Sequence, residues 1–199
     1  MPPNARFLVV SGLPASGKSS LGSALAQALA VPLLDKDALL EALFDQRGVG
    51  DTSWRRQLSQ AADRGLQQQA AKLPAAVLVS WWRHPRSTGD SGTPIAWLTS
   101  LPALPVEIHC RCSPAIAAQR FVSRTRHPGH LDQRWSRADL FATFSEQALL
   151  GPLRIGPLLE VNTEQAIDLG ALLAALNAMQ LLPFPLALWS HVDPDAPPQ

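Results

Sequence analysis

The sequence predicts an α/β protein built on a parallel β-sheet. Short apolar runs alternate along the chain with longer stretches in which apolar residues recur at helical spacing. The runs are hydrophobic nearly throughout, which is typical of parallel strands covered by helices on both faces. A glycine-containing stretch, residues 12–19, lies between the first apolar run and the first helical stretch. Together these features favour strands joined by right-handed helical crossovers.

Length and composition restrict the class of protein. The chain has 199 residues, of which 46% are hydrophobic and 17% charged, as in a globular domain that buries a proper core. A formal net charge of +1 gives no reason to expect a nucleic-acid or membrane surface. No apolar run is long enough to span a bilayer, and no signal pattern is visible. We expect a cytoplasmic protein with one domain over residues 1–180 and an extended tail over residues 181–199.

The first half of the chain is expected to contain two strands and three helices. Pro74 ends the third of these helices because proline cannot continue a helix. In order, we expect a strand over Phe7–Val10, a helix over Ser19–Ala30, a strand over Val31–Leu34, a helix over Ala38–Phe44, a loop over Gln46–Ser53 and a helix over Trp54–Leu73.

The second half continues the alternation of strands and helices. Ser113 and Pro114 resemble an N-cap followed by proline at the first helical position. In order, we expect a strand over Ala75–Trp82, a loop over Arg83–Pro94, a short helix over Ile95–Leu101, a strand over Val106–Cys112, a helix over Pro114–Arg124, a helix over Ser136–Leu150, a strand over Leu158–Val161 and a helix over Glu164–Met179.

Residues 12–19 match G-x-x-x-x-G-K-[ST], the phosphate-binding P-loop. Glycines let successive backbone N–H groups face a phosphate, and the helix N-terminus that follows adds partial positive charge. Lys18, expected to be solvent-accessible in the empty site, would reach the β- and γ-phosphates, and the Ser19 hydroxyl would ligate Mg²⁺. The sequence thus predicts binding of a nucleoside triphosphate. The nucleotide-binding residues expected here are Gly12, Leu13, Pro14, Ala15, Ser16, Gly17, Lys18, Ser19 and Ser20.

Two carboxylates follow the second predicted strand, at the sheet edge where ligands bind in open α/β folds. Asp37 could accept the proton of a substrate hydroxyl as that hydroxyl attacks the γ-phosphate. Its position also suits a cap for the following helix, and the two roles are compatible. Asp35 could belong to the water shell of the metal ion or could be an ordinary strand-end carboxylate.

Arg120, Arg124 and Arg126 form a basic cluster near the end of a predicted helix. Arg120 and Arg124, four residues apart, would share a helical face, where two like charges are unfavourable unless an anion lies between them. A triphosphate could be that anion, and such arginines neutralise charge on a transferred phosphoryl group. The proline-glycine break at Pro128 suggests a hinged lid over about residues 114–135. A solvated basic face is the alternative.

Three further side-chain groups are less specific. The loop over Arg83–Pro94 could contact an acidic acceptor or could be an ordinary mobile surface loop. His127 and His130 flank a turn, where structural roles are favoured over catalytic ones. Cys110 and Cys112 are expected to be buried, reduced thiols, since no further cysteine exists to complete a zinc site.

With these motifs assembled, the chain resembles small P-loop kinases of the chloramphenicol phosphotransferase and zeta-toxin type, a group also described as AAA family ATPases. The resemblance runs from about Phe7 to Asn177, through GLPASGKSS, LLDKDALLEALF, HCRCSPAIAAQRFVSRTR and RHPGHLD. It implies a P-loop NTPase fold with a five-stranded parallel sheet in the order 2-3-1-4-5, flanked by helices, with a helical lid. It also implies ATP with Mg²⁺ as donor, Asp37 as the carboxylate that activates the acceptor hydroxyl, and the three arginines on the lid.

The chain departs from many P-loop enzymes at the end of the third strand, where Val77–Ser80 contains no acid to order the Mg²⁺ shell. Ser19, water and Asp35 are left to hold the ion. The sequence predicts a kinase that transfers the γ-phosphate of ATP to a hydroxyl of a small molecule. A nucleotide-dependent switch without kinase chemistry is the main alternative. Phosphorylation of a nucleic-acid end or a nucleotide sugar is a third option, and the near-neutral charge argues against its nucleic-acid form.

Overall fold

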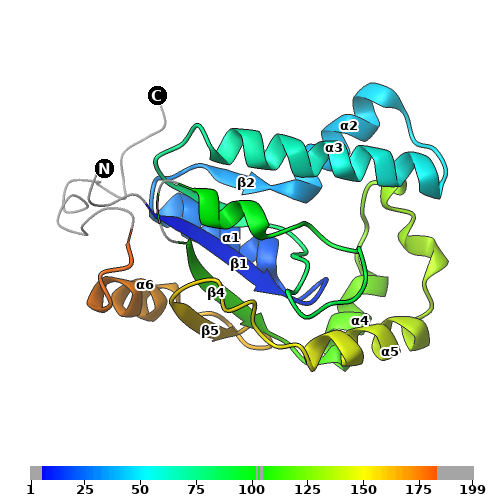
Figure 1. The fold of residues 1–199 in the computed structure, drawn as a ribbon. Coiled ribbons are helices and arrows are strands. Elements are labelled where there is room, and N and C mark those ends of the chain that lie inside the picture. Colours follow the sequence, from blue (N-terminus) through cyan, green and yellow to red (C-terminus); the bar gives the residue numbers. More distant parts are fainter. Residues whose placement is uncertain (1–5, 102, 104, 183–199) are drawn as a thin grey trace, which may run out of the picture.

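The computed structural model describes residues 6–101, 103 and 105–182, and these form a five-stranded parallel sheet in the order β2-β3-β1-β4-β5 (Figure 1). This order confirms the topology that the family resemblance implies. Every strand pairs in parallel with its neighbours, so the carboxyl ends of the strands lie along one edge. The strands are β1 (Phe7–Gly12), β2 (Leu33–Asp35), β3 (Ala76–Val79), β4 (Pro105–Arg111) and β5 (Leu158–Asn162).

Helices cover both faces of the sheet and add an outer layer beyond its carboxyl edge. The α-helices are α1 (Lys18–Ala28), α2 (Lys36–Arg47), α3 (Thr52–Ala70), α4 (Pro114–Ser123), α5 (Arg137–Ala148) and α6 (Leu169–Ala178). Short 3₁₀ turns occur at η1 (Ala96–Ser100), η2 (Pro128–His130) and η3 (Asp132–Arg134).

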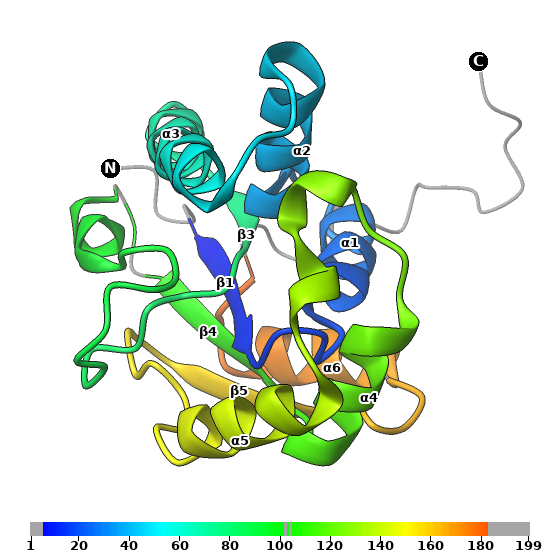
Figure 2. The same ribbon diagram turned by 90° about the vertical axis from the view of Figure 1, so that its right-hand side faces the viewer.

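The alternation of side chains along β1 divides the core between the two faces. Leu8 and Val10 pack with the apolar stripes of α1 and α6, while Phe7 and Val9 pack with α3 and η1. Figure 2 shows α1 and α6 on one side of the sheet and α3 on the other. Because β1 is the central strand with helices on both faces, these four side chains are fully buried.

A separate apolar cluster joins α4 and α5 to the P-loop. Phe121 and Phe144 meet with ring centroids 6.0 Å apart, and Leu13 packs beside them. A further cluster joins α2 to α3 through Leu40, Phe44 and other apolar residues. These clusters attach the outer helices to the carboxyl edge of the sheet, where the candidate site lies.

The boundaries differ from the sequence expectations where local hydrogen bonds decide them. Helix α2 begins at Lys36, two residues before the expected Ala38, because Asp35 caps it. Helix α6 begins at Leu169 rather than Glu164, since the Asp168 side chain accepts a hydrogen bond from the Ala171 N–H at 2.9 Å. Strand β3 ends at Val79, and the residues expected to extend it to Trp82 leave the sheet. Instead, Trp82 makes an isolated bridge with Thr93.

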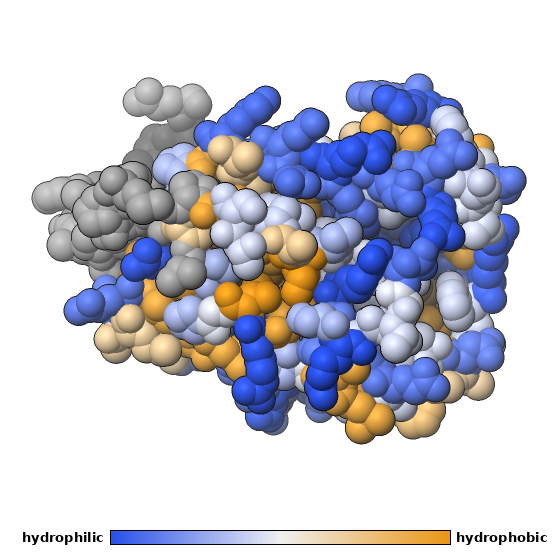
Figure 3. Space-filling model, viewed as in Figure 1, coloured by the Kyte–Doolittle hydropathy of each residue, from blue (hydrophilic) through white to orange (hydrophobic). Residues whose placement is uncertain are grey.

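Hydrophilic side chains cover much of the face in Figure 3, with apolar side chains gathered near its centre. Among the described residues, no helix combines the length and apolarity needed to cross a membrane. Most of the expected tail, residues 183–199, lies outside the described residues. Leu181 and Leu182, at its start, are buried against the core.

Candidate active site

The P-loop curls between β1 and α1 through residues with positive φ. Gly12 has a φ of +130° and Gly17, the N-cap of α1, a φ of +92°. A Cβ on Gly12 would lie 2.6 Å from the Cys110 carbonyl oxygen, so a side chain there would displace β4. Helix α1 has no side-chain cap and no acidic residue in its first turn. Its free N–H groups and dipole therefore favour an anion at this position.

Lys18 lies inside the P-loop. Its Nζ donates a hydrogen bond to the Leu13 carbonyl oxygen at 2.6 Å, and the residue is only 8% exposed. The expectation of a solvent-accessible Lys18 is therefore wrong, because the loop wraps around the ammonium group. Burial lowers the pKa of Lys18 to about 8, although nearby Cys110 and Asp37 oppose this shift. The ammonium group thus occupies a place that a phosphate would stabilise.

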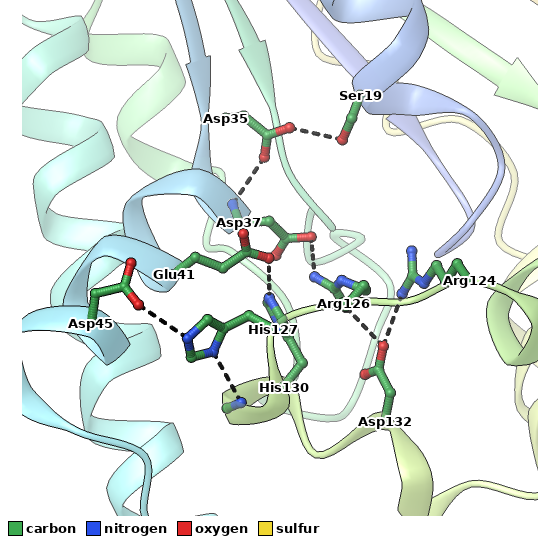
Figure 4. Close-up of polar contacts among 11 residues, drawn as sticks. Ser19, Asp35, Asp37, Glu41, Asp45, Arg124, Arg126, His127, His130 and Asp132 are labelled. Atoms are coloured by element: carbon green, nitrogen blue, oxygen red, sulfur yellow. Dashed lines mark hydrogen bonds and ion pairs between the residues drawn. The ribbon is translucent and has the colours of Figure 1, made fainter.

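Asp35, at the end of β2, joins the P-loop helix to α2. It accepts a hydrogen bond from the Ser19 hydroxyl at 2.7 Å through Oδ2, and one from the Asp37 N–H at 2.9 Å through Oδ1 (Figure 4). Asp35 is therefore the cap of α2, and the alternative role of Asp37 as that cap is wrong, because Asp37 lies inside the first turn. Burial raises the pKa of Asp35, against the effect of these two hydrogen bonds.

Asp37 points from the first turn of α2 toward the segment after α4, where Arg126 forms an ion pair with it (Figure 4). Burial acts to raise the pKa of Asp37, but Arg126, His130 and Lys18 outweigh it, and the pKa is lowered. The two neighbouring carboxyl groups thus have pKa values shifted in opposite directions. Such separation is frequent where carboxyl groups have different roles.

Arg120 lies on α4, whereas Arg124 and Arg126 follow the end of that helix. Helix α4 ends at Ser123 and Arg124 adopts an extended conformation, so the expected shared helical face of Arg120 and Arg124 is wrong. Arg120 donates to the Thr163 carbonyl oxygen at 2.9 Å. Arg124 and Arg126 approach Asp132 at 3.5 and 3.2 Å, respectively. The cavity nevertheless brings all three arginines to the P-loop.

His127 and His130 attach the segment after α4 to α2. His127 accepts from the Gly129 N–H at 3.1 Å, and its other ring nitrogen lies 3.2 Å from Asp45 (Figure 4). His130 lies 2.7 Å from Glu41 and edge-on to the ring of Phe44. Both histidines therefore have structural contacts, as the sequence favours. His130 also lines the P-loop cavity beside Asp37, so it contacts both α2 and the candidate site.

A cavity of about 1050 Å³ unites most of the predicted site. The predicted residues that line it are Pro14, Ala15, Gly17, Lys18, Ser19, Ser20, Asp35, Asp37, Arg120, Arg124 and Arg126. Ser16 is buried and lines neither this cavity nor its neighbour. Sequence reasoning missed other lining residues, among them Thr52, Arg55, Arg134 and Trp135. These belong to helix and loop segments without a motif, so only the chain's folding brings them to the P-loop.

The residues present fit a magnesium ion of the kind that P-loop enzymes use. Mg²⁺ takes oxygen ligands and is commonly held by one or two protein oxygens, water and substrate phosphates. The adjacent oxygens of Ser19 and Asp35 line the cavity beside the P-loop and supply such a set. Ser80 follows β3, at the place where many P-loop enzymes have an acid that orders the Mg²⁺ shell, and its hydroxyl shares a hydrogen bond of 2.5 Å with Thr93. The described residues contain no cluster of three or more His, Cys, Asp or Glu able to hold a metal.

A second cavity of about 460 Å³ lies along the same edge and is lined by Gly12 and Leu13. On its sheet side, the buried carboxyl group of Glu107 accepts hydrogen bonds from the Ser11 hydroxyl at 2.6 Å and from the Leu153 and Arg154 N–H groups, both at 2.8 Å. His109 Nδ1 lies 2.8 Å from the Ser11 oxygen. Because Ser11 donates to Glu107, Nδ1 must carry a proton and Nε2 is left as an acceptor.

The cations of the loop after β3 contact backbone carbonyl groups. Arg83 donates to the Gly92 carbonyl at 3.3 Å, and Arg86 donates to that of Leu150. His84 Nε2 lies 3.1 Å from the Pro152 carbonyl oxygen. These contacts join residues 83–92 to the segment that follows α5. The side chains that the sequence suggested for contact with an acidic acceptor are thus already bound to backbone carbonyl groups.

A 2-3-1-4-5 parallel sheet with a G-x-x-x-x-G-K-S loop between β1 and α1 defines a P-loop nucleotide-binding protein of the kinase type. Residues 7–140 match the model of a family described as an AAA domain, and the chain belongs to this family of P-loop proteins. No curated protein matches the chain.

Solved structures agree with this assignment. The chain is 33% identical to a presumed kinase from Chloroflexus aurantiacus, with a TM-score of 0.73 over 88% of this chain and 98% of that one. It shares the fold of a gluconokinase from Sinorhizobium meliloti (24% identity, TM-score 0.52, 94% of both chains). It also shares that of a sugar kinase from Janibacter sp. (18% identity, TM-score 0.57, 90% of this chain and 96% of that one). The chain is thus a kinase-like phosphotransferase.

Proposed function

We propose that this protein is a kinase that transfers the γ-phosphate of ATP to a hydroxyl group of a small molecule, with Asp37 as the general base. The observation that carries the proposal is the place of Asp37 in the P-loop cavity, separate from the Ser19–Asp35 pair. The donor phosphates would lie on the P-loop N–H groups and Lys18. A hydroxyl beside Asp37 would then face the γ-phosphate.

In the proposed reaction, the acceptor oxygen forms a bond to the γ-phosphorus as its proton passes to an Asp37 carboxylate oxygen. The bond from the γ-phosphorus to the bridging oxygen breaks, and ADP leaves with the electron pair. The low pKa of Asp37 keeps this carboxylate ionised near neutral pH. Such a carboxylate is a weak base, which is compatible with a loose transition state that needs little proton transfer.

Charge on the transferred group would be neutralised by Lys18, Arg120 and Arg124, which line the cavity. Mg²⁺, held through Ser19 and the water shell of Asp35, would screen the phosphate oxygens. Arg126 pairs with both Asp37 and Asp132 and so links the two carboxylates. Residues 114–135, which carry these arginines, would act as the lid.

The test is ATP turnover by purified protein, with Mg²⁺, against a panel of hydroxylated metabolites and antibiotics, with phosphorylated product detected by mass spectrometry. We expect slow hydrolysis of ATP alone and many-fold stimulation by one acceptor. Asp37→Asn should lower product formation by about 10²–10⁴-fold while ATP affinity stays nearly unchanged. Lys18→Ala provides a control in which turnover is lost because the contact with the phosphates of ATP is removed.

Full product formation by folded Asp37→Asn would rule out Asp37 as the base. Tight ATP binding without any phosphorylated product, together with a protein partner bound in one nucleotide state only, would favour the switch instead.

A further inference from the structure

We infer that the acceptor carries an anionic oxygen group, a carboxylate or a phosphate, and that Arg55 binds this group. The inference rests on the proposed function, because it names the class of molecule whose hydroxyl would face Asp37. Arg55 is the fourth residue of α3 and lines the P-loop cavity together with Thr52 and Arg134.

The Arg55 guanidinium makes no hydrogen bond or ion pair with any part of the chain that the structure describes, and its Nε is shielded from solvent without a partner. Burial lowers the pKa of Arg55, with Asp132 opposing the shift. A partly buried, unpaired cation is costly unless a ligand supplies the missing charge and acceptors. The other arginines that line the cavity have contacts: Arg120 with Thr163, Arg124 and Arg126 with Asp132, and Arg134 with Thr52.

The carboxylates near Arg55 are already engaged. The negative charges of Asp37 and Asp132 both act to raise the pKa of Arg55, but Arg126 forms ion pairs with both of these carboxylates. The positive charges of Arg126 and Arg134 repel that of Arg55 and act to lower its pKa. The surroundings of Arg55 thus include two further arginines and two carboxylates that already pair with Arg126, and its planar guanidinium suits two oxygens of a carboxylate or phosphate.

Position and size also agree with an acceptor. Lys18, Asp37 and Arg55 line the same cavity, and Asp37 acts on the pKa of both Lys18 and Arg55 through its charge. A cavity of about 1050 Å³ is at the upper end of the usual size of a ligand pocket, which is roughly 300–1,000 Å³. A small hydroxylated anion held by Arg55 would thus place its hydroxyl toward Asp37 while the nucleotide fills the other end.

The first experiment measures anion binding without needing the true acceptor. Malonate and orthophosphate are titrated by calorimetry into protein saturated with Mg²⁺ and the non-hydrolysable analogue AMP-PNP, which fills the donor end. We expect wild type to bind at least one probe and Arg55→Gln to bind it at least about tenfold more weakly. Arg56→Gln is the matched control, because Arg56 is exposed on the same helix and pairs with Asp90. Equal binding by Arg55→Gln, or no binding of either probe by wild type, overturns the inference.

A second measurement separates the acceptor from the γ-phosphate as the source of the anion. Arg55→Gln should bind AMP-PNP and ADP as wild type does, with thermal unfolding confirming that the variant folds. Weakened binding of AMP-PNP alone would place Arg55 on the γ-phosphate and overturn the inference. Phosphorylation of an uncharged polyol at wild-type rate by Arg55→Gln would also overturn it while leaving the kinase intact. Anion binding through Arg55 without phosphoryl transfer would instead refute the kinase alone.

Discussion

Lys18 is a single residue whose charge is buried where a bound phosphate would stabilise it. The ammonium group is buried, donates to the Leu13 carbonyl and has a pKa lowered to about 8 by burial. In the unfolded chain a lysine keeps its ordinary pKa, so between pH 8 and its ordinary value near 10.5 the unfolded state binds more protons. Stability of the ligand-free protein should therefore rise as pH increases through this window, with the penalty for the buried charge fully present below it.

Nucleotide binding should depend on pH through the same group. A phosphate beside Lys18 favours the charged form and raises its pKa, so binding near pH 8.5 should take up a proton. Affinity should consequently fall as pH rises above 8, which calorimetry in buffers of different ionisation enthalpy would measure. Lys18→Arg is the control because arginine stays protonated. The same proton uptake in that variant would mean that another group is responsible.

At the scale of elements, the start of α2 depends on Asp35. Its side chain caps the helix and joins it to Ser19, while its raised pKa shows that burial disfavours the charge. Asp35→Ala should lower the free energy of unfolding by about 1 kcal/mol through loss of the cap. Asp35→Asn retains a cap oxygen and removes the buried charge, so its stability near pH 7 should equal or exceed that of wild type.

Chemical denaturation of the two Asp35 variants, compared with Asp37→Asn, would check this prediction. Asp37→Asn leaves the cap intact but removes the charge that pairs with Arg126, so it reports the cost of that ion pair without the cost of the cap. Equal losses in Asp35→Ala and Asp35→Asn would show that the cap is not what Asp35 contributes.

At the scale of the whole molecule, Glu107 connects parts of the chain that are distant in sequence. Its buried carboxyl group accepts from Ser11 on β1 and from two backbone N–H groups after α5. The segment it holds contains Arg154 at a φ of +59°, which is unusual for a residue other than glycine. The Glu107 side chain thus links β1 and β4 to the segment after α5, and Leu153 of that segment lines the second cavity.

Glu107→Gln should lower the free energy of unfolding by about 1–3 kcal/mol, because the amide cannot accept from all three donors and a buried N–H loses its partner. Glu160→Gln is the comparison, since Glu160 is exposed on β5 near the same cavity and should change stability by less than about 0.5 kcal/mol. Urea denaturation would measure both. Similar effects of the two substitutions would contradict the anchoring role of Glu107.

The sequence by itself determined the sheet, the phosphate-binding loop and the nucleotide-binding class of the protein. Apolar runs and helical periodicity are local properties. The G-x-x-x-x-G-K-S stretch between Phe7–Val10 and the next helix likewise specifies the phosphate-binding turn from neighbouring residues alone. The order of the strands came from the family resemblance, and the structure confirmed it. The roles of Asp37 and the three arginines remain proposals, although the cavity brings these residues together.

Only the tertiary structure decided how those residues are paired and exposed. Asp35 rather than Asp37 caps α2, Lys18 is enclosed, and Arg124 lies beyond the end of α4. Helical spacing places Arg55, but not Arg56, on the side of α3 that carries Leu58, but it does not show that Arg55 lines the cavity without a partner while Arg56 pairs with Asp90. The physical reason is that burial and ion pairing depend on which distant segments meet, whereas strand and helix formation depends on neighbours along the chain.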